Sequence, residues 1–491
     1  MAEMLAAAID LPGVSILSEK ALIQHGRPLH GSAQIKASVA RALIAALSDE
    51  CKAYCILSGY QQLPDSFDSD IDFMVDKEDF RRLPHIIETL SLQTDTKLFQ
   101  SIEHEITGRA YLLASLSSNG VTFIQLDSAS DYRHFDSLWL RSSEVLPARR
   151  WHPRGFWIPS PAHEFAYYLV KRINKSEFTP QHGSILRRLY AEDPSGCNEM
   201  IARFWRPQIQ RNALIQMANS NDWSPLIADL ETFHEELMRN TGESSLQKVA
   251  SIPSRGLHFL GRVVRPTGGF VALMGPDGCG KSTVLNAISQ QFAPAFRNIQ
   301  RFHMRPYLLG RANSAKGPVT DPHGQPPRGM LASVAKVFYF AADYVFGYLL
   351  KILPALIRTR LVLFDRYMYD LLVDSKRVRY GGPHWLLRFA TRFIPRPDLV
   401  VLLDAPPEVL WSRKQEVPFE EVTRQRSAYR QIAGKMRSTV IVNAELPPGE
   451  VIDRVADAII DYFAARTARR LKLSSPHSVQ TIEADLPSYK C

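Results

Sequence analysis

Cysteine is scarce in this sequence, and its first residues do not resemble a secretion signal. Five cysteines among 491 residues are too few for a disulfide framework, and Cys279 lies in a glycine-rich loop where a free thiol is expected. The opening segment, MAEMLAAAIDLPG, has no basic flank ahead of a long apolar core, which argues against a signal peptide. Both observations favour a reducing, cytoplasmic location. A zinc site is not expected either, because Cys51 and Cys55 have no second pair to accompany them.

Long runs of like charge or of apolar residues are also missing. The net charge of +9 suits anionic substrates such as nucleotides. The basic residues are dispersed, so nucleic-acid or membrane-surface contact is a weaker reading of that charge. The most apolar run is 337–353; it contains Asp343 and Lys351, ends at Pro354, and is short for a membrane span. We therefore predict a buried helix there and no span.

The length predicts several domains, because a single hydrophobic core does not extend over 491 residues. Proline, glycine and arginine between 251 and 269 mark a boundary between two halves. We expect an N-terminal extension (1–30), an α+β domain (31–150) with an appended helical subdomain (151–250), a linker (251–268), an α/β domain (269–470) and a flexible tail (471–491).

One glycine-rich stretch fits the phosphate-binding pattern G-x-x-x-x-G-K-[ST] without a mismatch. A strand-like run, 270–274, precedes it and a helical pattern follows it from Ser282. Glycines let successive backbone N–H groups turn toward phosphate oxygens, and the helix adds its positive N-terminal end. Lys281 is expected to reach the β- and γ-phosphates, and the Ser282 hydroxyl to bind Mg²⁺. The predicted ATP-binding residues are Gly275, Asp277, Gly278, Cys279, Gly280, Lys281, Ser282 and Thr283.

Strands and helices alternate after Phe270, which predicts a parallel α/β sheet flanked by helices. Three further motifs follow the loop: RFHMRP at 301–306, LVLFDRY at 361–367 and PDLVVLLD at 397–404. In this order the motifs resemble the thymidylate kinase family of P-loop nucleoside monophosphate kinases, over residues 268–465. The resemblance implies an ATP-dependent phosphotransferase that uses Mg²⁺.

The resemblance also implies roles for individual residues. Asp277 would lie near the acceptor sugar, Asp365 would organise Mg²⁺ or its waters, and Arg366 would bind the acceptor phosphate. Arg305 resembles the arginine of an Arg-Glu-Pro element in the family. The candidates for a lid over the transferring phosphoryl group are Arg413, Arg424, Arg426 and Arg430. A lysine, a metal ion and mobile arginines are sufficient for phosphoryl transfer, which depends mainly on positioning and charge neutralisation.

Departures from the family pattern concern the acceptor. The Arg-Glu-Pro element reads Met304-Arg305-Pro306 here, and 368–372 replaces a Ser-x-Ala-Tyr-Gln stretch that helps to form the thymidine pocket. A glycine- and proline-rich insertion, 310–329, lies beside the acceptor site. A dTMP-like nucleoside monophosphate and another small-molecule acceptor therefore both stay open. Members of the family are often dimers, and the apolar segment 331–357 could form a homodimer contact or pack on the N-terminal half.

Carboxylates on predicted strands characterise the N-terminal half. Asp70 and Asp72 alternate with apolar residues, so both lie on one face of a strand, and Asp127 ends a later strand. Neighbouring carboxylates repel unless a divalent cation lies between them, so a Mg²⁺ site is expected. With the preceding Gly59 turn, this spacing resembles the nucleotidyltransferase superfamily. The departure is Tyr60, which follows Gly59 where the family usually has Gly-Ser or Gly-Gly.

Three functional hypotheses follow from these motifs. The first is an ATP-dependent phosphotransferase of thymidylate kinase type, fused to a nucleotidyltransferase-like domain. The second places the main chemistry in a metal-dependent nucleotidyl transfer at Asp70, Asp72 and Asp127, with the P-loop half regulatory. The third is an ATP-gated binding protein in which the loop acts as a switch.

Overall fold

A computed structural model describes residues 31–240, 261–308 and 326–473, apart from the single positions 69, 106, 118, 135, 136 and 437. The predicted extension (1–30), part of the predicted linker (251–260), most of the insertion (310–325) and most of the tail (474–491) lie outside the described residues. The described chain forms two compact units. We call 31–240 with 466–473 the N-terminal unit, and 261–308 with 326–465 the C-terminal unit.

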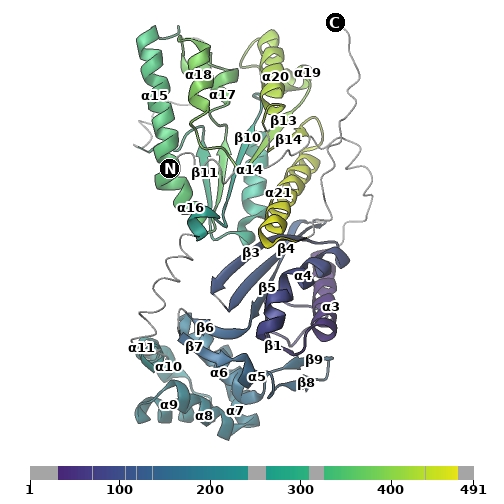
Figure 1. Ribbon diagram of the computed structural model, residues 1–491, viewed down its shortest axis with the longest axis vertical. Helices are drawn as coiled ribbons and strands as arrows, with labels where there is room; N and C mark the ends of the chain where they lie inside the picture. The colour runs from purple at the N-terminus through teal and green to yellow at the C-terminus, as the bar shows by residue number, and fades with distance from the viewer. Residues whose placement is uncertain are drawn as a thin grey trace. The chain divides into compact units, whose positions relative to one another are not determined.

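The C-terminal unit contains a five-stranded, wholly parallel sheet in the order β11-β12-β10-β13-β14 (Figure 1). Its strands are β10 (Gly269–Met274), β11 (Ile299–His303), β12 (Leu361–Asp365), β13 (Leu399–Asp404) and β14 (Thr439–Asn443). Its α-helices are α14 (Lys281–Gln291), α15 (Met330–Gly347), α16 (Leu353–Ile357), α17 (Asp370–Val373), α18 (His384–Thr391), α19 (Pro407–Arg413), α20 (Phe419–Ala433) and α21 (Pro448–Leu471). The last residues of α21, from 466 on, are assigned to the N-terminal unit.

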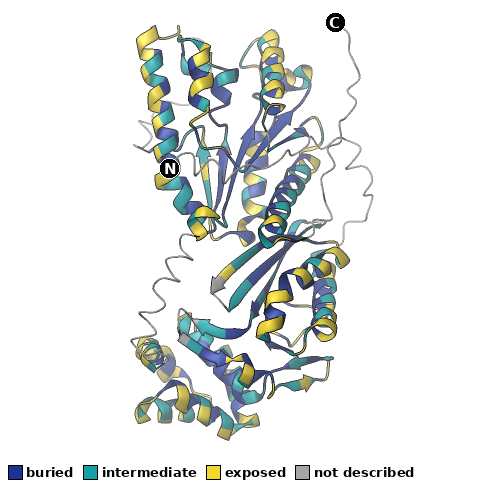
Figure 2. Cartoon of the chain, in the orientation of Figure 1, coloured by how far each residue is buried: buried dark blue, intermediate teal, exposed yellow. Residues whose placement is uncertain are grey.

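Burial explains why these strands are continuous apolar runs. Every residue of β10 and β13 is buried, as expected when helices cover both faces of a parallel sheet (Figure 2). Because all five strands run in one direction, the loop after Met274, Asp365 and Asp404 meet at the same edge. The predicted parallel sheet with flanking helices is confirmed.

The N-terminal unit is built on a mixed sheet in the order β1-β2-β5-β4-β3. The strands β2 and β5 are parallel, and the other neighbours are antiparallel. The strands are β1 (Tyr54–Ser58), β2 (Ile71–Val75), β3 (Lys97–Glu105), β4 (Gly108–Ser117) and β5 (Gly120–Ala129), with α3 (Ser32–Glu50) and α4 (Lys77–Gln93) as the accompanying helices.

Short strand pairs and a set of helices complete this unit. They are β6 (Asp131–His134), β7 (Ser137–Arg141), α5 (Ser142–Val145), β8 (Arg150–His152), β9 (Phe156–Ile158), α6 (Pro161–Asn174), α7 (Pro180–Glu192), α8 (Pro194–Phe204), α9 (Gln208–Ser220), α10 (Ser224–Ala228) and α11 (Leu230–Asn240). Helix α6 begins with a common capping arrangement, in which the Ser160 side chain accepts the backbone N–H of His163 and Pro161 occupies the first turn.

The apolar segment after residue 330 differs from the prediction. It forms one long helical stretch, Met330–Ile357, comprising α15, a π-helical segment η2 (Tyr348–Ile352) and α16. Only 39% of the most apolar 18 residues of this stretch are buried. The prediction of a buried helix is therefore wrong for one of its faces. By length and composition this stretch could cross a membrane, a criterion that helices of soluble proteins also meet. Helical periodicity explains the mixed burial: one face carries Phe340 and Tyr344 into the core, and the opposite face carries Phe338 and Phe346 outward.

Candidate active site

The phosphate-binding loop joins β10 to α14 in a conformation that depends on glycine. Gly275 and Gly278 have φ values of +145° and +84°, which residues with a side chain rarely adopt. A Cβ at Gly275 would lie 2.5 Å from the Leu403 carbonyl oxygen. Lys281 is buried, and its ammonium donates to the carbonyl oxygens of Gly275 and Pro276, both at 2.8 Å. These bonds hold the lysine across the loop, where incoming phosphates would take the place of the carbonyls.

Asp365 ends β12 beside this loop and has an acceptor without a partner. Its Oδ1 is buried and unpaired, while Oδ2 lies 3.4 Å from His303 Nδ1. Burial by itself would raise the pKa of this carboxyl, but the His303 hydrogen bond and the Lys281 charge lower it. An ionised carboxylate with a free oxygen fits Mg²⁺, and the exposed Ser282 hydroxyl at the start of α14 is a suitable second ligand.

Asp277, inside the loop, is held by two arginines from the segment that follows β12. Arg366 Nη2 donates to Asp277 Oδ1, and Arg377 Nη1 donates to Oδ2 at 2.6 Å. Burial by itself would raise the pKa of this carboxyl, but Arg366, Lys281 and Arg377 hold it well below its usual range. Arg377 also lies 4.0 Å from Glu416, in the α19–α20 connection. Arg377 was not predicted from the sequence; no motif marks it.

A buried network holds Arg366 in place. Its backbone adopts φ = +68°, a strained conformation for a side-chain-bearing residue that often occurs at functional sites. Asp370 lies 3.5 Å from Arg366 Nη1 and accepts from the Tyr429 hydroxyl and the Tyr367 backbone N–H, at 2.5 and 2.9 Å. Arg366 is therefore fixed between Asp370 and Asp277. Neither Asp370 nor Tyr429 was predicted as a site residue.

Arg305 is paired with an acid from α15. Its Nη1 lies 3.3 Å from Asp343 Oδ2, and its guanidinium lies 4.3 Å from the Phe340 ring centroid. Asp343 also accepts the Leu308 backbone N–H at 2.7 Å. The carboxylate partner of Arg305 therefore comes from α15, where the sequence marks Asp343 only as a lone carboxylate in an apolar helix.

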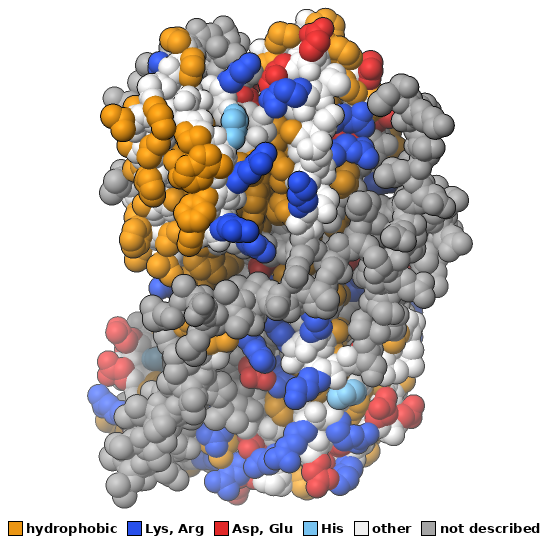
Figure 3. Space-filling model, turned by 45° about the horizontal axis from the view of Figure 1, so that its top comes forward, with side chains coloured by type: hydrophobic (Ala, Val, Ile, Leu, Met, Phe, Trp, Pro, Cys, Tyr) orange, Lys and Arg blue, Asp and Glu red, His pale blue; other side chains and the backbone are white. Residues whose placement is uncertain are grey.

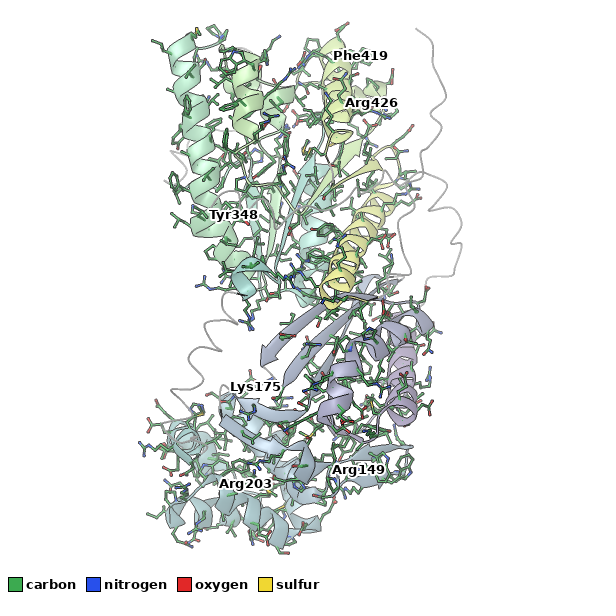
Figure 4. All side chains as sticks on the ribbon, in the orientation of Figure 1. Arg149, Lys175, Arg203, Tyr348, Phe419 and Arg426 are labelled. Carbon is green, nitrogen blue, oxygen red and sulfur yellow. The ribbon has the colours of Figure 1, made fainter. Side chains whose placement is uncertain are left out.

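The four predicted lid arginines are engaged elsewhere in this conformation. Arg426, labelled on α20 in Figure 4, and Arg430 both donate to Asp404 at the end of β13. Arg424 binds Glu421, and Arg413 donates to the Ala444 carbonyl oxygen at 2.8 Å. The arginines that donate to Asp277 in the loop are Arg366 and Arg377, so lid roles for these four residues stay predictions.

In the N-terminal unit, the parallel pairing of β2 and β5 brings the predicted carboxylates together. Asp72 is directly opposite Asp127 in the register, and Gln125 Nε2 lies 3.4 Å from Asp70 Oδ2. Burial, followed by repulsion from the other two carboxylates, raises the pKa of Asp127 to about 7. Lys171 of α6 donates to Asp72 at 2.6 Å. Within the described ranges, no group of three or more His, Cys, Asp or Glu is arranged as a metal site, so a metal here stays a prediction.

Tyr60, the departure from the nucleotidyltransferase pattern, points into the unit. Its hydroxyl donates to the buried Glu164 carboxylate, at 2.8 and 2.7 Å from the two oxygens. Burial raises the pKa of Glu164 to about 7, although the tyrosine hydrogen bond and Arg150 lower it. Tyr60 is 4% exposed, so here it serves as a packed anchor for α6.

The loop, the Asp365 carboxylate and the parallel sheet together define the C-terminal unit as a P-loop kinase fold. Residues 273–455 match the family model of thymidylate kinase. The chain is similar to a thymidylate kinase from Xylella fastidiosa, with 28% identity over 213 residues that cover 41% of this chain and 86% of that protein. It is 29% identical over 205 residues to a thymidylate kinase from Bacillus cytotoxicus, covering 39% of this chain and 96% of that protein.

Among solved structures, a thymidylate kinase from Ehrlichia chaffeensis matches with a TM-score of 0.28 and 16% identity, covering 39% of this chain and 98% of that chain. The family-model match over residues 273–455 and the relatives from Xylella fastidiosa and Bacillus cytotoxicus support a thymidylate kinase-like domain in the C-terminal half, and with it a phosphotransferase of the kinase type.

Proposed function

We propose that this protein transfers the γ-phosphate of Mg-ATP to a dTMP-like nucleoside monophosphate or another small phosphorylated acceptor. The observation that carries the proposal is the ion-pair cluster of Asp277, Arg366 and Arg377, whose carboxylate also lies within the electrostatic influence of Lys281. Two arginines that are held by one carboxylate beside a phosphate-binding loop are positioned to receive an acceptor phosphate.

The chain's own groups would act by positioning and charge neutralisation. The loop N–H groups and Lys281 hold the ATP phosphates, and the ammonium exchanges the carbonyls of Gly275 and Pro276 for phosphate oxygens. Arg366 and Arg377 bind the acceptor phosphate and neutralise charge on the transferring group. Mg²⁺, bound by Asp365 and Ser282, would supply a fixed positive charge on the ATP phosphates.

The test is transfer of labelled γ-phosphate from Mg-ATP to a panel of acceptors. The panel holds dTMP, the other nucleoside monophosphates and phosphorylated and free sugars. Label is expected in at least one phosphorylated acceptor and is expected to disappear in Lys281→Ala. Intact ATP binding without transfer to any member would contradict the proposal and favour an ATP-gated binding protein.

A second candidate function belongs to the N-terminal unit. The observation that favours it is the pair Asp72 and Asp127, opposite each other on parallel strands with Asp70 nearby. A divalent cation that displaced Lys171 from Asp72 would relieve the repulsion between these carboxylates and is the cofactor that nucleotidyl transfer would need. Asp72→Asn is expected to abolish transfer of label from the α-phosphate of a nucleoside triphosphate and to leave γ-phosphate transfer intact. An absence of α-label transfer by the unmodified protein to the same panel would exclude this candidate for those acceptors.

A cytoplasmic location is part of the same proposal. The described cysteines, Cys51, Cys55, Cys197 and Cys279, are all free thiols, which is compatible with a reducing compartment.

A further inference from the structure

A cavity of about 380 Å³ is lined by the edge strand β11, by η2 and α16, and by the turn that precedes β12. None of its described lining residues is acidic, and four are cationic: Arg301, Lys351, Arg358 and Arg360. We call it the basic cavity. Like charges repel one another, so four cations gathered around one cavity favour the binding of an anion there.

Two of the four cations have no partner in the described part of the chain. Lys351 donates to two backbone carbonyl oxygens, and Arg301 donates to the Asn286 side chain at 2.6 Å. The Arg358 and Arg360 guanidinium groups make no hydrogen bond or ion pair with another described residue. Because a planar guanidinium binds phosphate through two parallel hydrogen bonds, a phosphate group is a suitable partner for these two arginines.

A rigid turn between α16 and β12 carries these two arginines. The backbone N–H groups of Arg358 and Arg360 both donate to the Ala355 carbonyl oxygen, at 3.1 and 3.0 Å. Thr359, between them, is buried with φ = +58°, and its hydroxyl lies 2.6 Å from that of Thr267. A residue with a side chain keeps this left-handed conformation only where its surroundings hold it. The backbone under both arginines is therefore fixed before a ligand arrives.

The cations are spread too widely for a single phosphate group to contact all of them. On the parallel strands Arg301 is opposite Leu363, which lies three residues beyond Arg360, or about 10 Å along the strand. The remaining described lining residues are Gln300 and the apolar Phe302, Leu350, Pro354 and Ala355. The basic cavity therefore fits an elongated ligand that has two or more phosphate groups and an organic part.

The basic cavity is separate from the phosphate-binding loop. Arg360 precedes Asp365 by five residues of extended chain, about 16 Å. Arg301 and Phe302 also line a neighbouring cavity of about 280 Å³ that reaches Asp365. The basic cavity thus adjoins the candidate active site without sharing the lysine and backbone groups that would hold ATP.

From these features we propose that the basic cavity binds a second small molecule with two or more phosphate groups, in addition to the ATP expected at the loop. Arg358 and Arg360 hold one phosphate group, and Arg301 holds another farther along β11. The organic part of the ligand lies against Phe302 and Pro354.

A second copy of the chain is the competing occupant of this region. Figure 3 shows hydrophobic side chains gathered over the side of the C-terminal unit that carries α15, which suits a contact between copies. Among the described residues 326–360, Asp343 is the sole acidic residue, and it is buried and paired with Arg305. A contact between two such helices therefore brings no anion to the cations, whereas a phosphorylated ligand does.

The test is calorimetric titration of the full chain with two probes, ATP and inorganic tripolyphosphate. We expect a site that the double variant Arg358→Ala/Arg360→Ala weakens on the order of 100-fold and that Lys281→Ala leaves intact. Binding at this site should weaken as salt rises. The matched control is Arg206→Ala/Lys435→Ala, which removes two exposed cations elsewhere and makes the same change in net charge. ATP binding at the loop shows that each double variant is folded.

The two probes also distinguish the kind of ligand. Equal affinity for tripolyphosphate and ATP at this site would indicate recognition of the phosphate chain, and tighter binding of ATP would indicate a nucleotide. The proposal is overturned if neither probe occupies a site that the cavity variant weakens. Equal weakening by the control variant would also overturn it, because attraction by net charge alone would then explain the binding. A dimer that Arg358→Ala/Arg360→Ala converts to a monomer, with no probe bound in the cavity, would assign these arginines to a subunit interface instead.

Discussion

Replacement of Arg377 by alanine tests the acceptor site most directly. Arg377 donates to Asp277 at 2.6 Å, and its side chain is 30% exposed. Its guanidinium can therefore release Asp277 to bind an incoming phosphate, and its removal does not open a deeply buried cavity. A hydrogen bond between charged groups contributes about 1.5 to 3 kcal/mol. Since about 1.4 kcal/mol corresponds to a tenfold change in rate, kcat/KM for the acceptor should fall by about 10- to 150-fold.

The assay is steady-state phosphoryl transfer, with acceptor and ATP varied separately. KM for ATP should stay within about twofold, because Lys281 and the loop backbone are untouched. Lys376→Ala removes a neighbouring exposed cation and is the matched control. The reasoning is refuted if Arg377→Ala retains the acceptor kcat/KM of the unmodified protein, or if Lys376→Ala is equally impaired.

Three further predictions concern the loop, the carboxylate group and the buried ion pair. Gly275→Ala should abolish ATP binding measured by calorimetry, because its Cβ would lie 2.5 Å from a backbone oxygen, while Gly449→Ala, in open space, should bind normally. Asp127 has a pKa raised to about 7, so the folded state binds more protons than the unfolded state between pH 4 and 7, and the N-terminal unit should lose stability as pH rises through that window. Asp127→Asn should flatten that dependence in pH-resolved thermal unfolding. Asp343→Ala should destabilise the C-terminal unit by about 1 to 3 kcal/mol in urea unfolding, because it leaves the partly buried Arg305 without its carboxylate; an effect below about 1 kcal/mol would show that this ion pair does not support the fold.

The strands around the candidate site show what could be predicted. The runs 361–365 and 399–404 form β12 and β13 because a strand covered on both faces must be apolar at every position. Parallel direction then places their terminal carboxylates at the loop edge. The burial of the stretch from 330 to 357 could not be predicted in this way, because an apolar composition does not indicate which face of a helix packs against the core and which stays exposed.

By itself the sequence determined the phosphate-binding loop and the chemistry of its lysine and hydroxyl, because that geometry depends on residues contiguous in the chain. It also indicated that Asp72 and Asp127 lie on strands, since apolar alternation indicates strand and face, but that these two strands are neighbours is seen only in the structure. Only the tertiary structure decided the partners of the charged groups. Arg377 and Asp277 are 100 positions apart, and Lys171 and Asp72 are 99 apart. Which charged side chains pair depends on how distant helices and strands pack together, and no single segment of the sequence specifies that packing.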